Sequence, residues 1–325
     1  MRLNVARLGM AAWTLAAVLI TGCGSSSSSG TTNKKAALTT AKKYGSTTGG
    51  STTPASTTTS LPATTPKIAA VAALVPASVK STGTLTVASD ATYAPNEFVA
   101  SDGHTVEGMD VDLVNALAGA MGLKATVTNQ TFDTIIPGLQ SHKYDIGASS
   151  FTDTKARQQV VDFVTYFSAG TSFYTKAQGG TSVSSLADLC GHTVAVEKGT
   201  TEQTDATAQG AKCKAANKGA VTLLIFPDQN EVNLAVQSGH AQVAMADSPV
   251  AAYAVKQSGG LLKLVGQPYG TAPYGLALPK GSGLAKPVLA ALKALMADGT
   301  YTKVLTKWGV QAGSITDPKI NGATS

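Results

Sequence analysis

Arginine is nearly missing from this sequence. Of its 325 residues only three are arginine, and two of them, Arg2 and Arg7, belong to the N-terminal leader, so Arg157 is the one arginine beyond it. Lysine supplies the other cations. Arginine differs from lysine where a carboxylate or phosphate must be held by two parallel hydrogen bonds. Scarcity alone leaves two readings open, a chance surface arginine or a dedicated anion ligand.

Acidic residues are missing from the first 80 positions. Eight basic residues lie there, which leaves 17 of the 25 basic residues to face all 19 acidic ones. The overall charge of +6 is therefore misleading, because the chain beyond residue 80 carries about −2. No basic stripe with interleaved aromatic residues follows, so we expect no nucleic-acid partner. The basic leader suits an anionic membrane or cell wall.

The N-terminus has the pattern of an export signal. Residues 1–22 combine a positive start with an apolar run that is shorter than the roughly 20 residues a membrane span needs. Residues 19–23 resemble a bacterial lipobox, which predicts that Cys23 is acylated; the alternative is an ordinary secreted protein cut nearby. Residues 23–80 are rich in Ser, Thr, Gly and Ala, and we expect a disordered tether. The predicted location is the extracytoplasmic face of the cell membrane, by a lipid anchor.

Cysteine is also scarce. With Cys23 assigned to lipid, only Cys190 and Cys213 remain, with 22 residues between them. An even number of remaining cysteines in an exported protein predicts a disulfide, although two free buried thiols are the alternative. Neither cysteine has another Cys or a His at metal-ligand spacing, so no metal site is predicted.

Beyond residue 80 the chain alternates between strand and helix patterns. The predicted strands are 84–88, 125–128, 144–148, 193–196, 221–226, 241–246, 261–265 and 274–278, and the chain is expected to run extended after residue 163 through 171–176. The predicted helices are 111–122, 133–141, 200–209, 230–238, 249–257, 284–296 and 301–308. Such alternation implies βαβ units and mostly parallel sheets. Ligands of such sheets lie beyond the carboxyl ends of the strands.

Polar residues follow four of these predicted strands. Asp90 and Tyr93 follow strand 84–88. Ser149, Ser150 and Thr152, and then Arg157, follow strand 144–148. Glu197, Thr200 and Thr201 follow strand 193–196, and Asp247 follows strand 241–246. At any single strand end, N-capping of the next helix would explain them. Together they can hold a zwitterion, because an arginine and a helix N-terminus accept a carboxylate and a separate aspartate accepts an ammonium. The rings of Tyr93 and Phe132 can cover a small apolar body.

Catalytic signatures are missing. The sequence has no Gly-x-Ser-x-Gly motif and no phosphate-binding loop of the Gly-x-x-x-x-Gly-Lys-Ser/Thr type. The four histidines lie in polar, loop-like contexts without ligand spacing, at positions 104, 142, 192 and 240. Asp110 and Asp112 are better explained as acidic residues at the start of a helix than as a catalytic acid/base pair. We therefore predict a binding site without enzymatic activity or a cofactor.

Three segments carry a resemblance to a known family. Residues 108–113, 132–140 and 149–163 resemble the signature segments of family-3 extracytoplasmic solute-binding proteins, the amino-acid-binding components of ABC transporters. The resemblance extends from about residue 83 to residue 308. It implies a periplasmic-binding-protein-like α/β fold with two lobes. One lobe consists of residues 81–173 plus 269–320, and the other of residues 174–268. Two hinge strands would join the lobes, which close on the ligand. It also implies ABC permease subunits as partners and a monomer.

The same resemblance assigns roles to the candidate residues. Arg157 would bind the α-carboxylate, Asp247 the α-ammonium, and Asp90 the polar end of the ligand side chain. The remaining contacts would come from Tyr93, Phe132, Ser149, Ser150, Thr152, Thr200 and Thr201. The serine pair is similar to that of the lysine/arginine/ornithine and histidine binders.

Glu197 departs from the family pattern, since it adds a second carboxylate near Asp90. This favours a basic amino acid. In the alternative, Glu197 points to solvent or pairs with Lys198, and the ligand is neutral, such as glutamine. A further alternative is an enzyme on the same scaffold, as in cyclohexadienyl dehydratase, and another is a sensor that signals through a separate chain.

Overall fold

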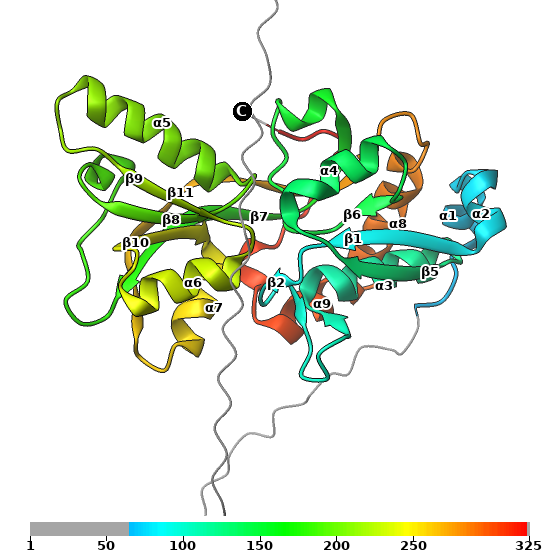
Figure 1. Ribbon diagram of the computed structural model, residues 1–325. Helices are drawn as coiled ribbons and strands as arrows, with labels where there is room; N and C mark the ends of the chain where they lie inside the picture. The colour runs from blue at the N-terminus through cyan, green and yellow to red at the C-terminus, as the bar shows by residue number, and fades with distance from the viewer. Residues whose placement is uncertain (1–64, 324–325) are drawn as a thin grey trace, which may run out of the picture. The chain divides into compact units, whose positions relative to one another are not determined.

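The structure, a computed structural model, describes residues 65–323 and builds them around one sheet of eight strands (Figure 1). Across the sheet these are β5 (Lys124–Asn129), β1 (Thr84–Ser89), β6 (Ile146–Gly147), β11 (Leu262–Pro279), β7 (Val161–Lys176), β10 (Val243–Asp247), β8 (Thr193–Glu197) and β9 (Thr222–Phe226). Strand β1 pairs in parallel with β5 and β6, and β8 pairs in parallel with β9 and β10. The predicted α/β class with parallel strands is confirmed.

Two long strands connect these parallel groups. Strands β7 and β11 pair antiparallel from Val161 with Pro279 to Lys176 with Leu262. We call the strands β5, β1 and β6 with their helices the β1 half, and β10, β8 and β9 with theirs the β8 half. The prediction of separate strands at 261–265 and 274–278 was wrong. Three register shifts, after Val265, Tyr269 and Tyr274, interrupt the ladder without ending the strand.

Helices lie on both sides of the sheet (Figure 1). The β1 half carries α3 (Met109–Met121), α4 (Phe132–Gln140), α8 (Ala285–Ala297) and α9 (Thr300–Trp308). The β8 half carries α5 (Thr201–Ala215), α6 (Gln229–Ser238) and α7 (Ser248–Gln257). Leu117 and Leu292 belong to the core of the first half, and Val236 and Val250 to a core of the second. A small separate sheet joins β2 (Thr92–Tyr93), β3 (Glu97–Val99) and β4 (Val106–Glu107).

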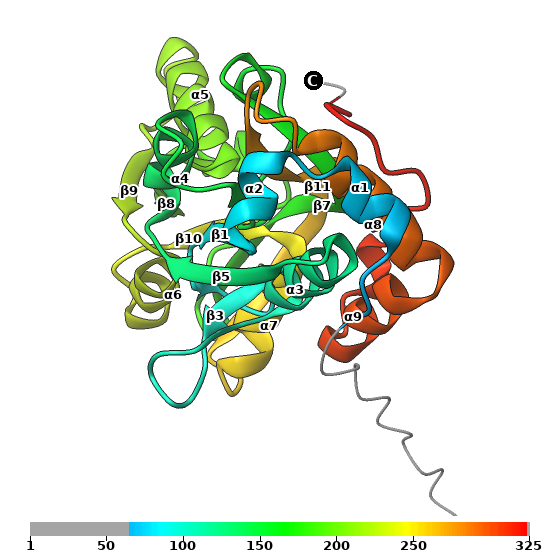
Figure 2. The ribbon, with the colours of Figure 1, turned by 90° about the vertical axis from the view of Figure 1, so that its right-hand side faces the viewer.

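The predicted tether extends too far. Within the predicted 23–80 segment, the described residues from 65 onward include helix α1 (Ala69–Leu74) and most of α2 (Ala77–Thr82). Helix α1 contacts α8, and Figure 2 shows the two side by side. Val71, Val75 and Val79 recur every four residues and are buried in the core of the β1 half. These recurring apolar residues distinguish the segment from the Ser/Thr-rich stretch before it. Residues 23–64, Cys23 and the predicted signal peptide lie outside the described residues.

The predicted disulfide is confirmed. Cys190 follows the short 3-10 helix η2 (Leu186–Leu189), Cys213 lies on α5, and their Cα atoms are 5.5 Å apart. Helix α5 was predicted to end at Gln209. It continues to Ala215, so Cys213 is part of the helix rather than of a loop.

Replacing both cysteines with alanine should lower the free energy of unfolding by about 3 kcal/mol, since the closed loop restricts the unfolded chain. Ligand affinity should not change, because neither cysteine lines the cavity described below. Urea unfolding and calorimetry of the two proteins check both statements. A reducing agent serves as the control: it should destabilise the wild type and leave the double variant unaffected. Equal unfolding curves for wild type and variant would contradict the prediction.

No helix within residues 65–323 is long and apolar enough to cross a membrane.

Candidate functional site

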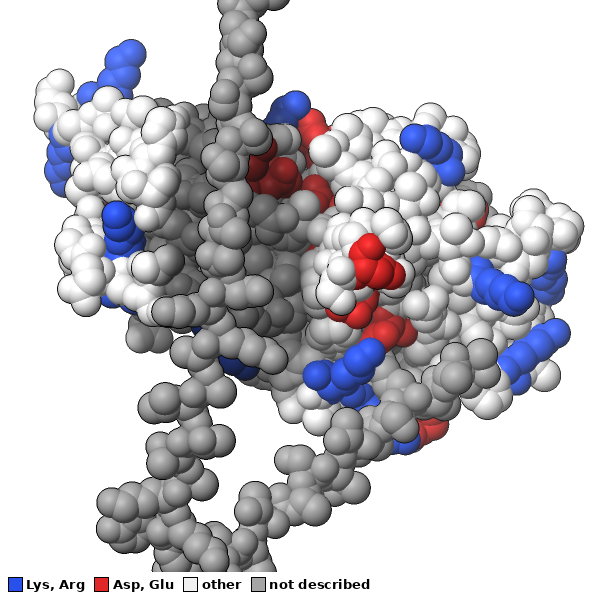
Figure 3. Space-filling view, turned by 60° about the horizontal axis from the view of Figure 1, so that its bottom comes forward, with Lys and Arg blue, Asp and Glu red and all other residues white. Residues whose placement is uncertain are grey.

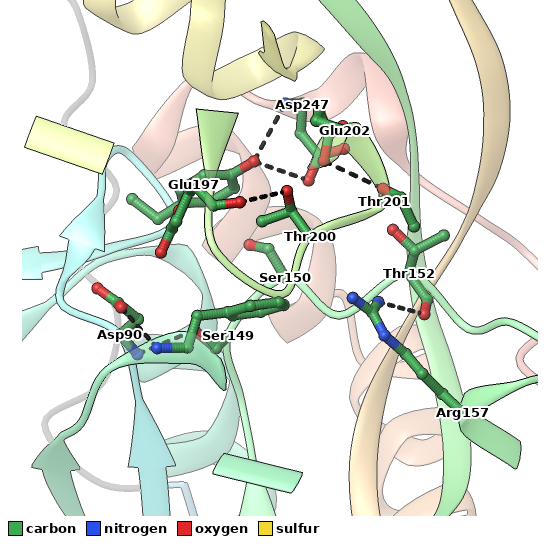
Figure 4. Close-up of a pocket in the computed structure, with 12 residues that line it drawn as sticks. Asp90, Ser149, Ser150, Thr152, Arg157, Glu197, Thr200, Thr201, Glu202 and Asp247 are labelled. Carbon is green, nitrogen blue, oxygen red and sulfur yellow. Dashed lines mark hydrogen bonds between the residues drawn. The ribbon is translucent and has the colours of Figure 1, made fainter. Parts of the chain in front are cut away.

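One cavity gathers all eleven residues that the sequence singled out as ligand contacts (Figure 4). They are Asp90, Tyr93, Phe132, Ser149, Ser150, Thr152, Arg157, Glu197, Thr200, Thr201 and Asp247. The space between these residues, counted together with the part open to solvent, is about 280 Å³, and one further residue, Glu202, completes the lining. The structure brings the eleven residues together, and their role as ligand contacts stays a prediction.

The lining follows from the ends of parallel strands. Asp90 follows β1, Ser149 and Ser150 follow β6, Glu197 ends β8, and Asp247 ends β10. The residues of the β1 half and those of the β8 half therefore meet from opposite sides. This is the place where an α/β sheet positions a ligand.

Arg157 lies at the start of the 3-10 helix η1 (Arg157–Gln159) and reaches toward the β8 half. Its Nη1 donates to the carbonyl of Thr152 at 2.8 Å, and its Nη2 donates to the carbonyl of Gly199 at 3.1 Å. The guanidinium carbon lies 5.4 Å from the ring centre of Phe132. Burial lowers the pKa of Arg157, and nearby carboxylates of Glu202 and Asp247 oppose this shift. Two of five N–H donors are used by these carbonyls, so others are available to an anion.

The N-terminus of α5 faces the same cavity. Thr200 caps the helix: its hydroxyl oxygen accepts the N–H of Gln203 at 3.1 Å, and its hydroxyl donates to the carbonyl of Glu197 at 2.8 Å. The first N–H groups of a helix lack carbonyl partners within the helix and attract anions. Arg157 and this helix end can therefore both donate hydrogen bonds to a carboxylate.

Asp247 provides a separate negative group. Its Oδ2 accepts a hydrogen bond from the hydroxyl of Tyr93 at 3.1 Å, and that hydroxyl oxygen accepts the backbone N–H of Asp247 at 3.1 Å. Burial raises the pKa of Asp247 well above its usual value, and the neighbouring Glu202 raises it further. An ammonium group at this position would replace the lost hydration of the carboxylate.

Glu197 is the carboxyl group with the fewest partners in the cavity. It is 2 % exposed, and its Oε1 has no hydrogen-bond partner within the described part of the chain. Burial raises its pKa well above the usual value, and Asp90 opposite raises it further. The alternative in which Glu197 reaches solvent or pairs with Lys198 is wrong, because Lys198 pairs with Asp133 at 2.7 Å. Glu197 faces the cavity instead.

Asp90 is held more firmly than Glu197. Its Oδ1 accepts from the N–H and the hydroxyl of Thr92, at 3.1 and 2.7 Å, and its Oδ2 accepts from the N–H of Phe132 at 2.8 Å. Burial raises the pKa of Asp90, while these hydrogen bonds lower it. Asp90 therefore both shapes the β1 side of the cavity and places a negative charge there.

Glu202 is the lining residue that the sequence patterns did not single out. It lies in the first turn of α5 and is 2 % exposed. Its Oε1 accepts from the hydroxyl of Thr171 on β7 at 2.6 Å, and its Oε2 accepts from Thr201 at 3.1 Å. The sequence did hold a signal, since an acidic residue directly follows the Gly-Thr-Thr segment. Early acidic residues are so common in helices that the signal was weak.

The lining is strongly acidic as a whole. Among its twelve residues there are four carboxyl groups and one cation, Arg157. Figure 3 shows acidic side chains near the middle of the face it presents and basic ones spread toward the periphery. Within residues 65–323 no three His, Cys, Asp or Glu side chains are placed to hold a metal ion. An organic cation that also carries a carboxylate fits this set of charges.

Comparison with known proteins identifies the family. The model of the bacterial extracellular solute-binding proteins, family 3, matches residues 85–311. The chain belongs to this family. It is 35% identical over 252 residues to the arginine-binding protein ArgT of Corynebacterium glutamicum, a match that covers 77% of this chain and 82% of that one. It is 32% identical over 209 residues to the ABC transporter glutamine-binding protein GlnH of Bacillus subtilis, covering 62% and 72% of the two chains.

A solved structure supports the same membership. An ancestral arginine-binding protein bound to arginine is 36% identical, with a TM-score of 0.65, and the match covers 70% of this chain and 98% of that one. All three relatives are described as binding proteins. This family-3 member is accordingly an extracytoplasmic binding protein, and the predicted absence of enzymatic activity agrees with these relatives.

Proposed function

We propose that this protein delivers a basic amino acid, with L-arginine as the first candidate, to an ABC importer. The observation that carries the choice of ligand is the buried Glu197 carboxyl group, whose Oε1 lacks a partner in the described chain. A buried carboxylate is costly unless a cation or hydrogen-bond donors approach it. Arginine is also the ligand named for ArgT and for the ancestral protein.

The cavity offers a place for each charged group of arginine. The α-carboxylate would lie between Arg157 and the N-terminus of α5, next to Thr152. The α-ammonium would contact Asp247. The guanidinium would extend toward Glu197 and Asp90, whose carboxyl groups come from opposite sides of the cavity. The rings of Tyr93 and Phe132 would flank the aliphatic stem.

Charge favours arginine over glutamine. Four lining carboxyl groups face one lining cation, and arginine adds a net positive charge whereas glutamine adds none. Hydrogen bonds between a guanidinium and a carboxylate contribute about 1.5–3 kcal/mol each, roughly twice those between neutral groups. Glutamine, the ligand named for GlnH, would leave Glu197 without a cation.

Ligand capture would bring the two halves together. We propose the lobes 81–173 plus 269–320 and 174–268, with the first extended back to residue 65 because of α1 and α2. Several contacts already join the halves: Arg157 donates to Gly199, Tyr93 donates to Asp247, and Lys198 pairs with Asp133. Strands β7 and β11 would act as the hinge, since both pass from one half into the other.

A lipid on Cys23 would keep the protein on the extracytoplasmic face of the membrane. Residues 24–64 would then let the binding part search near its permease while staying attached. We expect one copy of the protein to act at a time.

Titration calorimetry with arginine, lysine, ornithine, histidine and glutamine tests the ligand. Arginine should bind most tightly, and glutamine should bind more weakly by at least about tenfold, the loss of one charge-assisted hydrogen bond. Native mass spectrometry of freshly purified protein supplies an independent check by weighing any ligand retained. Tight glutamine binding without arginine binding would contradict the proposal.

A further inference from the structure

Two carboxyl groups, Glu97 and Asp110, are completely buried behind the cavity. Glu97 starts β3, Asp110 lies in the first turn of α3, and both are 0 % exposed. Neither lines the cavity, and the binding mode proposed above uses neither. Their burial is costly, so their contacts indicate what they do.

Most donors to this pair come from Ser149 and Ser150, which do line the cavity. Asp110 Oδ2 accepts the backbone N–H of Ser150 at 2.9 Å. Glu97 accepts the hydroxyl groups of Ser149 and Ser150, each at 3.3 Å. Tyr166 on β7 donates its hydroxyl to Asp110, 2.7 and 2.6 Å from the two oxygens. The pair therefore supports the serine segment from behind.

The serine segment needs such support. Ser150 has a φ of 50°, a left-handed conformation that is uncommon for residues other than glycine. Ser149 passes the effect on to the β1 strand end, because its Oγ accepts the N–H of Asp90 at 2.9 Å. Two of the proposed ligand contacts, Asp90 and Ser150, are thus linked to the buried pair.

No cation compensates the pair. Within residues 65–323, no Lys, Arg or His forms an ion pair or hydrogen bond with Glu97 or Asp110, and the charged or titratable groups facing them are Asp90 and Tyr166. Burial and then Asp110 raise the pKa of Glu97 well above its usual value. Burial raises the pKa of Asp110 to about 6, against the hydrogen bonds from Tyr166 and Ser150. Two carboxyl groups in this position cannot both ionise at moderate cost.

We propose that Glu97 and Asp110 share one proton at neutral pH, and that the resulting single negative charge on Asp110 positions Ser150 for ligand binding. Glu97 is the protonated member and Asp110 the ionised one. Asp110 as a carboxylate accepts the Ser150 N–H and the Tyr166 hydroxyl at once, whereas protonated Glu97 can donate to it. The binding readout rests on the function proposed above, but the protonation state does not.

A matched pair of one-atom substitutions tests this assignment. Glu97→Gln replaces a protonated carboxyl by an amide of the same shape. The amide keeps one of the two acceptor atoms and removes no charge, so arginine affinity should fall by about fivefold or less. Asp110→Asn removes the charge that two donors require and should weaken binding by about tenfold or more. The affinity of wild type and Glu97→Gln should fall below about pH 6, where Asp110 takes up a proton, and Asp110→Asn should lack this step.

Equal losses in the two variants, or a larger loss in Glu97→Gln, would overturn the proposal. If Asp110→Asn does not fold, Tyr166→Phe takes its place, because it removes one hydrogen-bond donor to the Asp110 carboxylate. In Tyr166→Phe the fall in affinity should occur at a higher pH than in the wild type. A fall at the same pH would overturn the proposal. An infrared difference spectrum between ligand-free wild type and Glu97→Gln should show the band of a protonated carboxyl group. Should the wild type bind no amino acid, the proposed function fails, and this spectrum still decides the protonation state.

Discussion

Replacing Arg157 with lysine is expected to weaken arginine binding by at least about a hundredfold, the loss of two charge-assisted hydrogen bonds. The guanidinium already donates to the carbonyls of Thr152 and Gly199 and would also hold the ligand carboxylate. A lysine ammonium has three donors on one atom and cannot reproduce this planar arrangement. The fold and the net charge should be preserved. Calorimetry measures the affinity, and thermal melting followed by circular dichroism measures the fold.

The exposed Lys155 provides the matched control. Lys155→Arg should bind arginine as tightly as the wild type. The double variant Lys155→Arg/Arg157→Lys keeps the composition and moves the guanidinium by two positions, and it should bind as poorly as Arg157→Lys. The carboxylate-binding role of Arg157 is wrong if Arg157→Lys retains wild-type affinity.

Glu197→Gln should alter ligand preference more than stability. We expect arginine affinity to fall by about tenfold to a hundredfold, because a charge-assisted hydrogen bond becomes a neutral one, while glutamine affinity stays nearly unchanged. Lys198→Gln is the control at the adjacent position, since its exposed ion pair with Asp133 contributes little. Calorimetric titrations of each variant with both ligands give the comparison. A parallel loss for arginine and glutamine would mean that Glu197 does not contact the ligand side chain.

The same residue should make binding depend on pH. Burial raises the pKa of Glu197 in the folded protein above its pKa in the unfolded chain. Its contribution to stability is therefore fully present below the pKa of the unfolded chain and is lost as the pH rises through the pKa of the folded protein. The ligand-free cavity therefore retains a proton at pH values where an exposed glutamate is ionised. A bound cation favours ionisation, so arginine should release protons on binding and should bind more weakly at lower pH. Titrations in buffers of different ionisation enthalpy count these protons, and Glu197→Gln should release fewer.

Strand ends made most of the cavity predictable from the sequence. Polar residues that follow parallel strands must gather at one edge, so Asp90, Ser150, Glu197 and Asp247 could be assigned to one place without coordinates. Their spacing along the chain could not tell which way Glu197 points. In the structure Glu197 lies inside, and the neighbouring Lys198 pairs with Asp133 of α4.

Contacts between distant segments were harder to predict. Glu202 belongs to the cavity because its carboxylate accepts from Thr171, which lies 31 residues earlier on β7. Helix α1 is stable where it contacts α8 and α3, although six residues are too few for a helix on their own. The continuity of β11 likewise depends on its long partner β7 rather than on its own pattern of glycines and prolines. In each case tertiary packing overrides the local sequence.

The contact between α1 and α8 also bears on how the polypeptide acquires its structure. The β8 half uses a contiguous stretch of chain from β8 to α7, whereas the β1 half needs α1 and α3 near the start and α8 and α9 near the end. A chain that emerges from its N-terminus can assemble the β8 half early. The β1 half must wait until the last helices have emerged, because until then the faces of α1 and α3 that pack on α8 and α9 stay uncovered. During secretion, this late-completed half is therefore the part most exposed to aggregation and proteolysis.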